Sequence, residues 1–163
     1  EDDLMEKAII SGVAHDTSEA KVTISGVPDR PGIAARVFRP LADAGVNIDM
    51  IVQNVSVAGR SDISFTVPRE DLSRAKKVME HLVTDVEASG FTSDEAVGRV
   101  SLVGAGMKTH PGVAATMFET LAAASVNIEM ISTSSIRISC VVAEDDVERA
   151  VRVLHDAFEL GEL

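Results

Sequence analysis

One feature of this sequence limits its fold more than any other: a long internal repeat. The stretch "VTISGVPDRPGIAARVFRPLADAGVNIDMIVQN", which begins at Val22, is matched by "VSLVGAGMKTHPGVAATMFETLAAASVNIEMISTS", which begins at Val100. The second copy carries two extra residues before its Pro-Gly pair, so that Pro31 matches Pro111. Because a repeat of this kind corresponds to a whole supersecondary unit, we expect two copies of one fold.

Hydrophobic periodicity predicts the same elements in each copy. In the first copy the predicted elements are strands at 22–24, 46–52, 63–67 and 87–93, and helices at 33–41 and 72–82. Pro31 is placed in the first turn of the first helix, whereas Pro40 is expected to kink or shorten that helix. The order βαββαβ predicts an α+β class with two ferredoxin-like domains, in which helices cover one face of each antiparallel sheet.

The second copy ends before a fourth strand, but a spare strand, "AIISGVAH" at residues 8–15, precedes the first copy. We therefore expect the spare strand to complete the second domain. The expected domains are residues 20–95 for the first, and residues 7–16 with 97–163 for the second. The first domain is thus inserted into the sequence of the second.

Composition excludes several classes of partner. A formal net charge of -11 repels nucleic acid and anionic membrane surfaces, and the absence of Trp and Tyr removes the usual platforms for stacking bases. No apolar stretch approaches the ~18 residues of a membrane span, so a cytoplasmic protein is expected. Cys140 is the only cysteine, and its alternating apolar surroundings predict a core thiol. Because the chain begins with Glu1, we expect a fragment or a processed product of something longer, with Met5 as an alternative native start.

Motifs for catalysis and cofactor binding are missing. Gly104 and Gly106 resemble the opening of a dinucleotide loop, but the third glycine and the acidic partner are absent. The four histidines are scattered and have no metal ligand at a suitable spacing. We therefore expect no catalytic residue, no metal and no cofactor in this chain.

The repeated corner suits a free amino acid. A helix N-terminus after the Pro-Gly pair offers N–H groups and a positive dipole end to a carboxylate. Asp29 or Asp49 is a candidate for binding the ammonium group, and Asn47 and Gln53 are candidates for a hydroxyl or amine. Period-two spacing places Asn47, Asp49 and Gln53 on one face, where they are expected to converge with the corner. The alternative is plain turn chemistry, but its repetition favours a site.

At "SGVAHDTSEAKVTISGVPDRPG", "VNIDMIVQNVS", "VSLVGAGMKTHPGV" and "VNIEMISTSSIRIS" the sequence resembles the tandem ACT domains of aspartate kinase. The similarity is to the regulatory β subunit of the actinobacterial α2β2 type and covers nearly the whole chain. It implies an allosteric subunit that binds L-threonine, often with L-lysine, and mediates feedback inhibition of amino-acid biosynthesis. It also implies a homodimer through the ACT domains and a catalytic α subunit, which alone binds ATP and Mg.

The resemblance implies an effector site shared between two chains. The implied residues are Asp29, Arg30, Pro31, Gly32, Ile33, Ala34, Asn47, Ile48, Asp49 and Gln53 from the first domain, and Val113, Ala114, Asn127, Ile128 and Ser134 from the second.

The chain departs from the family pattern at Ala114, where many relatives have threonine, and at Ser135, where glutamate is usual. The loss of a carboxylate at Ser135 argues against lysine as a co-effector. Two other functions remain open. One is a tandem ACT sensor of another biosynthetic enzyme, such as acetolactate synthase. The other is a ferredoxin-like RNA-binding or catalytic domain, which the net charge and the missing aromatic residues disfavour.

Overall fold

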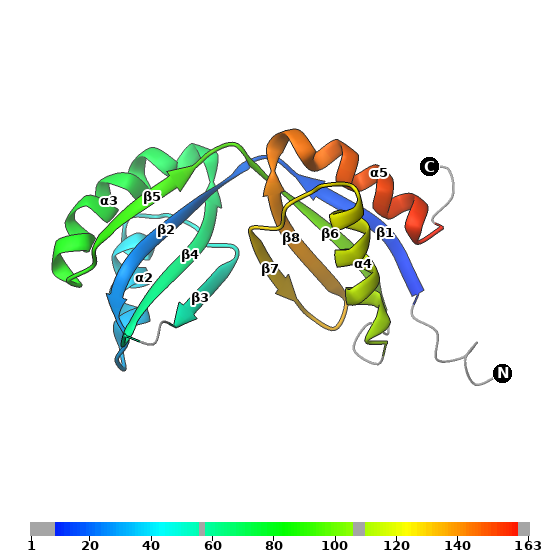
Figure 1. Cartoon of the computed structure of the whole chain (residues 1–163). Coiled ribbons are helices and arrows are strands. Elements are labelled where there is room, and N and C mark those ends of the chain that lie inside the picture. Colours follow the sequence, from blue (N-terminus) through cyan, green and yellow to red (C-terminus); the bar gives the residue numbers. More distant parts are fainter. Residues whose placement is uncertain (1–8, 56–57, 106–109, 160–163) are drawn as a thin grey trace. The chain divides into compact units, whose positions relative to one another are not determined.

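The computed structural model describes residues 9–55, 58–105 and 110–159, and it contains two four-stranded antiparallel sheets (Figure 1). The chain divides into two units. One is Ser18–Glu95, and the other consists of the flanking segments that end at Thr17 and resume at Ala96. The predicted fold class, two ferredoxin-like α+β domains with the first inserted into the second, is confirmed.

The first-copy unit has a sheet in the order β3-β4-β2-β5. Its elements are β2 (Glu19–Pro28), α2 (Ile33–Asp43), β3 (Ile51–Val55), β4 (Arg60–Pro68), the short 3-10 helix η1 (Arg69–Asp71), α3 (Leu72–Asp85) and β5 (Gly90–Asp94). β2 and β4 lie at the centre, so β3 and β5 are the edge strands.

The second-copy unit has a sheet in the order β1-β6-β8-β7. Its elements are β1 (Ile9–Asp16), β6 (Val97–Ala105), α4 (Gly112–Ala123), β7 (Met130–Thr133), β8 (Arg137–Ala143), η3 (Glu144–Asp146) and α5 (Val147–Ala157). β1 pairs antiparallel with β6, with His15 opposite Val100. The N-terminal strand thus occupies the edge position that β5 has in the other sheet.

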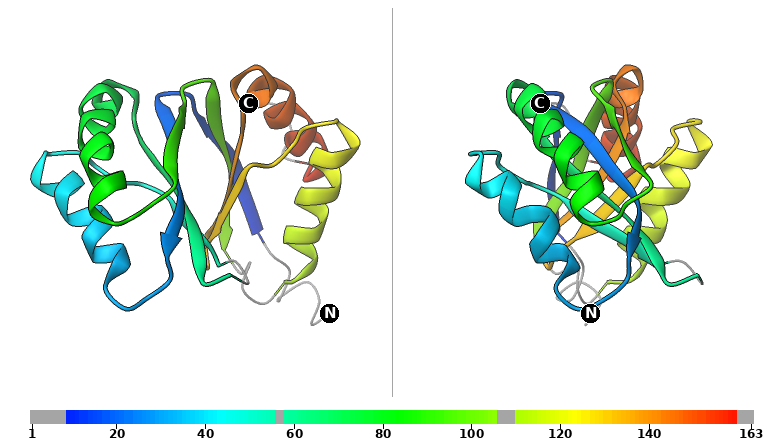
Figure 2. Two further views of the ribbon diagram at one scale, coloured as in Figure 1. Left: turned by 60° about the vertical axis from the view of Figure 1, so that its left-hand side comes forward. Right: turned by 90° about the vertical axis from the view of Figure 1, so that its left-hand side faces the viewer.

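In each unit both helices lie on the same face of the sheet, as the turned views show (Figure 2). α2 buries Ile33, Val37 and Leu41 against its sheet, and these residues recur every four positions on one side of the helix. Phe38 from the same helix meets Phe65 of β4 edge to face, with ring centroids 5.3 Å apart. Burial of each such side chain contributes about 1.5–3 kcal/mol, so helix-on-sheet packing stabilises the unit by several kcal/mol.

An arginine holds the end of the first helix in each unit. Arg74 of α3 donates from Nη1 to the carbonyl oxygens of Ala44 and Gly45, at 3.2 and 3.1 Å. Arg149 of α5 donates from Nε to the carbonyl oxygen of Ala124 at 3.0 Å. Both guanidinium groups also form ion pairs three residues back, with Asp71 and Asp146 respectively. The otherwise unpaired carbonyls at these helix ends are therefore satisfied from the neighbouring helix.

Two expectations about the first copy were wrong in detail. The strand predicted at 46–52 begins only at Ile51, although its alternation of buried and exposed side chains starts at Val46. Pro40 does not shorten its helix, because α2 continues to Asp43 and ends at the position that matches the end of α4.

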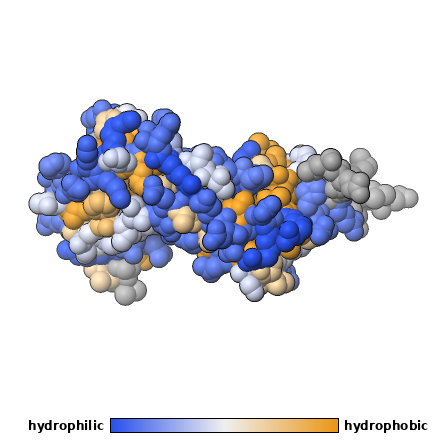
Figure 3. Space-filling view, turned by 90° about the horizontal axis from the view of Figure 1, so that it is seen from above, coloured by the Kyte–Doolittle hydropathy of each residue, from blue (hydrophilic) through white to orange (hydrophobic). Residues whose placement is uncertain are grey.

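The face shown in Figure 3 is mostly hydrophilic, with hydrophobic residues in patches between polar ones. This agrees with the excess of acidic residues in the sequence. Among the described residues, no helix is both long enough and apolar enough to cross a membrane.

A hydroxyl pair lies at the matching position in the central strands of each unit. Thr23 and Ser64 hydrogen-bond at 2.8 Å, and the matching residues Ser101 and Ser139 do so at 2.7 Å.

Ser61 of β4 is 1% exposed, and within the described part of the chain its Oγ has no hydrogen-bond partner. A buried hydroxyl without a partner destabilises the folded state, because it loses its bonds to water.

We expect Ser61→Ala to raise the free energy of unfolding by up to about 1 kcal/mol, because the orphaned hydroxyl is removed. Ser139→Ala is the matched control, and it should lower that free energy by about 1 kcal/mol because Ser101 loses its partner. Urea unfolding followed by far-UV circular dichroism measures both. Equal destabilisation by the two substitutions would contradict the assignment of Ser61.

The interpretation of Cys140 as a core thiol is confirmed. Its side chain is fully buried and makes no disulfide, and this burial raises the pKa of the thiol from 9.0 to about 12. The folded state therefore keeps the proton at a pH where the unfolded thiol has already lost it.

We expect this stabilising contribution of Cys140 to be complete below pH 9.0 and to disappear as the pH rises toward about 12. The unfolding free energy of the protein should then fall more steeply above pH 9.0 than that of Cys140→Ala, which lacks the titrating group. Urea titrations of both chains at several alkaline pH values measure the difference. Parallel pH profiles would show that the thiol does not control this dependence.

Candidate functional site

The first-copy corner connects β2 to α2. After β2 ends at Pro28, the N–H of Asp29 donates to the carbonyl oxygen of Gly59 at 2.9 Å, and the N–H of Ile33 donates to that of Arg30 at 3.2 Å. α2 has no side-chain cap and no acidic residue in its first turn. The first N–H groups of an α-helix have no partner inside the helix, so this end offers hydrogen-bond donors and a positive dipole end.

Gly32 is the N-cap of α2 and has a φ of 87°. An L-residue disfavours this left-handed conformation, which explains the glycine. Pro31 lies before this cap, so its predicted place inside the first helical turn was wrong. Asp29, Arg30 and Ala34 are exposed, whereas Ile33 is buried and anchors the helix.

The second-copy corner is built differently. Residues 106–109, which include Gly106, lie outside the described part of the chain. Pro111 is the N-cap, and Gly112 is the first residue of α4. α4 also has no side-chain cap and no acidic first turn, and Val113 and Ala114 in that turn are half-buried. Within the described part of the chain, both copies therefore present a helix N-terminus without a side-chain cap.

The predicted alternation on the polar strand segment is confirmed. Asn47, Asp49 and Gln53 are exposed, Met50 is buried and Ile48 is half-buried. The backbone N–H of Asp49 donates to the carbonyl oxygen of Thr66 at 3.0 Å, which ties this segment to β4.

The expected convergence of the corner with Asn47 and Asp49 does not occur within the unit. The corner lies at the end of the sheet where Val27, Ser61 and Val55 are neighbours. Asp49 lies six residues before Val55, roughly 20 Å along the strand direction, and Gln53 lies between these ends. The reason is topological: the corner precedes α2 and Asn47 follows it, and α2 returns the chain to the opposite end of the sheet.

The second copy repeats this separation. Asn127 and Ile128 follow α4, whereas Ser134 lies in the turn between β7 and β8, where its N–H donates to the carbonyl oxygen of Arg137 at 2.8 Å. That turn is at the corner end of the sheet, since the N–H of Gly104 at the end of β6 donates to Ile136. Each unit therefore supplies two separate groups of the predicted site residues, one at each end of its first helix.

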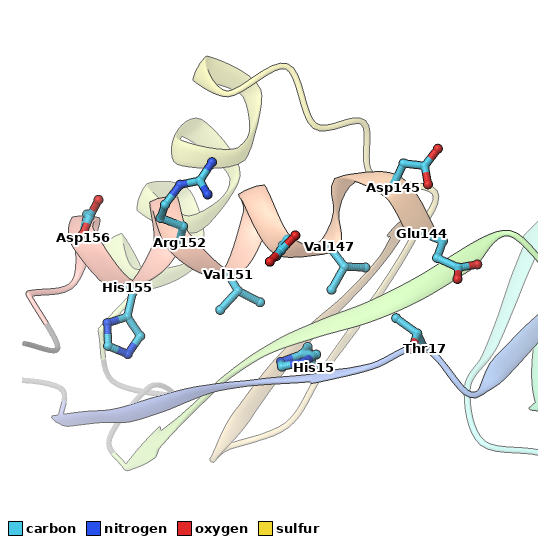
Figure 4. A pocket seen from close by; sticks show the side chains of 10 residues that line it. His15, Thr17, Glu144, Asp145, Val147, Val151, Arg152, His155 and Asp156 are labelled. Atoms are coloured by element: carbon cyan, nitrogen blue, oxygen red, sulfur yellow. The ribbon is translucent and has the colours of Figure 1, made fainter. Parts of the chain in front are cut away.

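A groove of about 890 Å³ runs between β1 and α5 (Figure 4). His15 and Thr17 from β1 and its end face Val147, Val151 and His155 of α5, and the rim carries several carboxylates and Arg152. It contains none of the predicted site residues. The described residues also include no group of three or more side chains suited to hold a metal ion.

The residues that hold the first corner in place are not among the predicted site residues. The N–H of Gly26 donates to Asp62 Oδ1 at 3.0 Å, and Arg60 Nη1 donates to the carbonyl oxygen of Gly26 at 2.7 Å. The signal was an isolated glycine inside a strand pattern, which often marks a bulge.

Comparison with known proteins places these features in a family. The chain matches the model of the ACT domain over residues 22–82 and 100–158. It is 53% identical over 163 residues to the aspartokinase of Corynebacterium glutamicum, a match that covers 99% of this chain and 39% of that protein. With the aspartokinase of Mycobacterium tuberculosis it shares 54% identity over 159 residues, covering 96% of this chain and 38% of the relative. The chain thus spans about two fifths of the length of these relatives.

Two solved structures are similar over nearly their whole chains. A crystal structure of aspartokinase alpha and beta subunits has a TM-score of 0.88 and 43% identity, with 93% of this chain and 100% of that chain covered. The ligand-free regulatory subunit of aspartate kinase from Thermus thermophilus has a TM-score of 0.86 and 38% identity, with 91% and 98% covered.

The matching glycines of the two corners should respond in opposite ways to the same substitution. We expect Gly32→Ala to cost about 1–2 kcal/mol of unfolding free energy, because its positive φ strains an L-residue. Gly112→Ala should stabilise by about 0.5–1 kcal/mol, because alanine is favoured in a helix. Among the described residues, no atom lies within 4 Å of a Cβ added at either glycine. Urea unfolding measures both, and a neutral Gly32→Ala would contradict the strained cap.

Proposed function

This chain belongs to the ACT domain family, as a tandem pair homologous to the regulatory subunit of aspartokinase, and from that premise we propose that it binds L-threonine and mediates feedback inhibition of an aspartate kinase. The chain itself is proposed to do no catalysis. ATP and Mg belong to the catalytic part, which phosphorylates aspartate.

The observation that carries the proposal is the uncapped N-terminus of α2 beside the exposed Asp29. An amino acid has a carboxylate and an ammonium group a few ångströms apart. The helix N-terminus stabilises the carboxylate, and the carboxylate of Asp29 attracts the ammonium group. Gln53 then remains to donate to or accept from the side-chain hydroxyl of threonine. An analogue without this hydroxyl would leave the amide without a partner, so it should bind less tightly.

The predicted site residues of the second domain are proposed to come from a partner chain. Asn127 and Ile128 lie after α4, at the end of their sheet that is remote from their own corner. If Asn127 and Ile128 of one chain contact the first-copy corner of another chain, each effector site contains residues from two chains. The proposal therefore includes a homodimer that forms through the ACT domains.

Threonine is the proposed effector because each of its polar groups has a candidate partner. Lysine carries a second ammonium group, which needs a further acceptor. Ser135, exposed in the β7–β8 turn, offers a hydroxyl in place of a carboxylate, and Ala114 offers none. We therefore propose threonine as the main effector and a weak or absent lysine effect.

Regulation requires that threonine binds one arrangement of the ACT domains more tightly than another. The effector then shifts the population toward the arrangement in which the catalytic part is inhibited. Its physiological setting is proposed to be the cytoplasmic biosynthesis of threonine and lysine.

The test is isothermal titration calorimetry with threonine, lysine and both together, on the parent chain and on two variants. Gln53→Ala should weaken threonine binding about tenfold, because a hydrogen bond at the effector is lost. Asn54→Ala is the matched control, since Asn54 is the next amide on the same exposed strand and should leave affinity unchanged.

Saturable heat with threonine and not with lysine is the expected result. No heat with either amino acid, from a folded dimer, would contradict the proposed effector function. Equal weakening by Gln53→Ala and Asn54→Ala would contradict the role given to Gln53 alone.

A further inference from the structure

A backbone irregularity lies just before the first-copy corner. The pairing of β2 with β4 shifts register between Ile24 and Val27, and Gly26 within this bulge has a φ of 67°. A Cβ on Gly26 would also collide with Ser89 Oγ. A bulge bends its strand and redirects the residues after it, so the path of the chain into the corner depends on Gly26.

Two charged side chains of β4 hold both polar groups of this glycine. Asp62 Oδ1 accepts its N–H at 3.0 Å, and Arg60 Nη1 donates to its carbonyl oxygen at 2.7 Å. Hydrogen bonds with one charged partner are stronger than neutral ones. Gly26 has no partner residue in the β2–β4 ladder, so Asp62 and Arg60 satisfy its N–H and its carbonyl oxygen in place of a strand neighbour.

The same arginine connects the bulge to a third segment. Arg60 Nη1 also donates to the carbonyl oxygen of Glu87 at 3.0 Å, in the turn between α3 and β5. Glu87 in turn lies 3.6 Å from the guanidinium of Arg30, a corner residue. The corner is thus linked to β4 and to this turn by side chains as well as by its own backbone.

The second copy provides an internal comparison. Gly104 matches Gly26, but its N–H donates to the backbone carbonyl of Ile136 at 2.9 Å, and it has no positive φ. The pairing of β6 with β8 has no register shift, and the residue that matches Asp62 is Arg137. The arrangement around Gly26 is therefore specific to the first copy and is not required by the fold.

We propose that Arg60 and Asp62 are positioning residues of the effector site: by holding Gly26 they set the place of Asp29 and of the α2 N-terminus. They act on the effector through the backbone of residues 26–32. This inference rests on the proposed function, because the consequence to be measured is effector affinity. Arg60 and Asp62 should therefore influence effector binding although neither belongs to the predicted site.

The experiment is calorimetric titration of the full chain and its variants with L-threonine, together with thermal unfolding without ligand. Asp62→Ala and Arg60→Ala should each weaken threonine binding about tenfold, since each removes a charge-assisted bond to Gly26. Asp62→Asn should restore most of the affinity, because its amide oxygen can still accept the Gly26 N–H. Asp43→Ala and Arg39→Ala are matched controls, which change the same charges at an exposed ion pair at the other end of the unit.

The expected pattern is weaker binding for the Arg60 and Asp62 alanine variants, parent affinity for both controls, and rescue by asparagine, with all variants folded. Parent affinity in Asp62→Ala and Arg60→Ala would overturn the positioning role and leave threonine binding intact. Weakening that Asp62→Asn does not relieve, or that accompanies unfolding, would also overturn it. Absence of threonine binding by the parent chain would overturn the proposed function and this role with it.

Discussion

The reversal of the chain by a helix between two strands controls the rest of this structure. In each unit the first helix returns the chain to the end of the sheet from which its preceding strand started. α2 has 11 residues and is about 16 Å long, so the segments before and after it lie on opposite sides of the unit. Its packing requires this arrangement, because the buried stripe of Ile33, Val37 and Leu41 must cover the sheet. Separation of the two halves of the candidate site is thus a direct result of core formation.

The two copies agree where packing dictates the structure and differ where a ligand is proposed to bind. Arg74 and Arg149 bond the matching helix ends, and the hydroxyl pairs lie at matching positions of the central strands. The corners differ in length and in their N-cap residue, which is Gly32 in the first copy and Pro111 in the second. They also differ in the groups that bond Gly26 and Gly104. The two units therefore share one framework, and only the first-copy corner has the extra polar support of Arg60 and Asp62.

Much of this was predictable from the sequence. Periodicity identified the strands, the helices and the buried face, because burial is what imposes the periodicity on residues such as Met50 and Phe65. The prediction that Asn47 and Asp49 meet the corner was wrong because it considered only which strand face they share. The order of the elements places these residues after α2, whereas the corner precedes that helix. The isolated Gly26 indicates a bulge, but the bonds of Arg60 and Asp62 to it also depend on the register of β4, which periodicity does not determine. The effector site as a whole stays a prediction.

The place of β1 has a practical consequence for anyone who divides this chain. The family match begins at residue 22, yet β1 (Ile9–Asp16) forms the edge of the second-copy sheet through its pairing with β6. A fragment cut at the start of that match would leave β6 as a bare edge, with its backbone N–H and C=O groups free to pair with another molecule. Such a fragment should aggregate even though every matched residue is present, because boundaries drawn from sequence similarity alone omit a strand that the second-copy sheet needs.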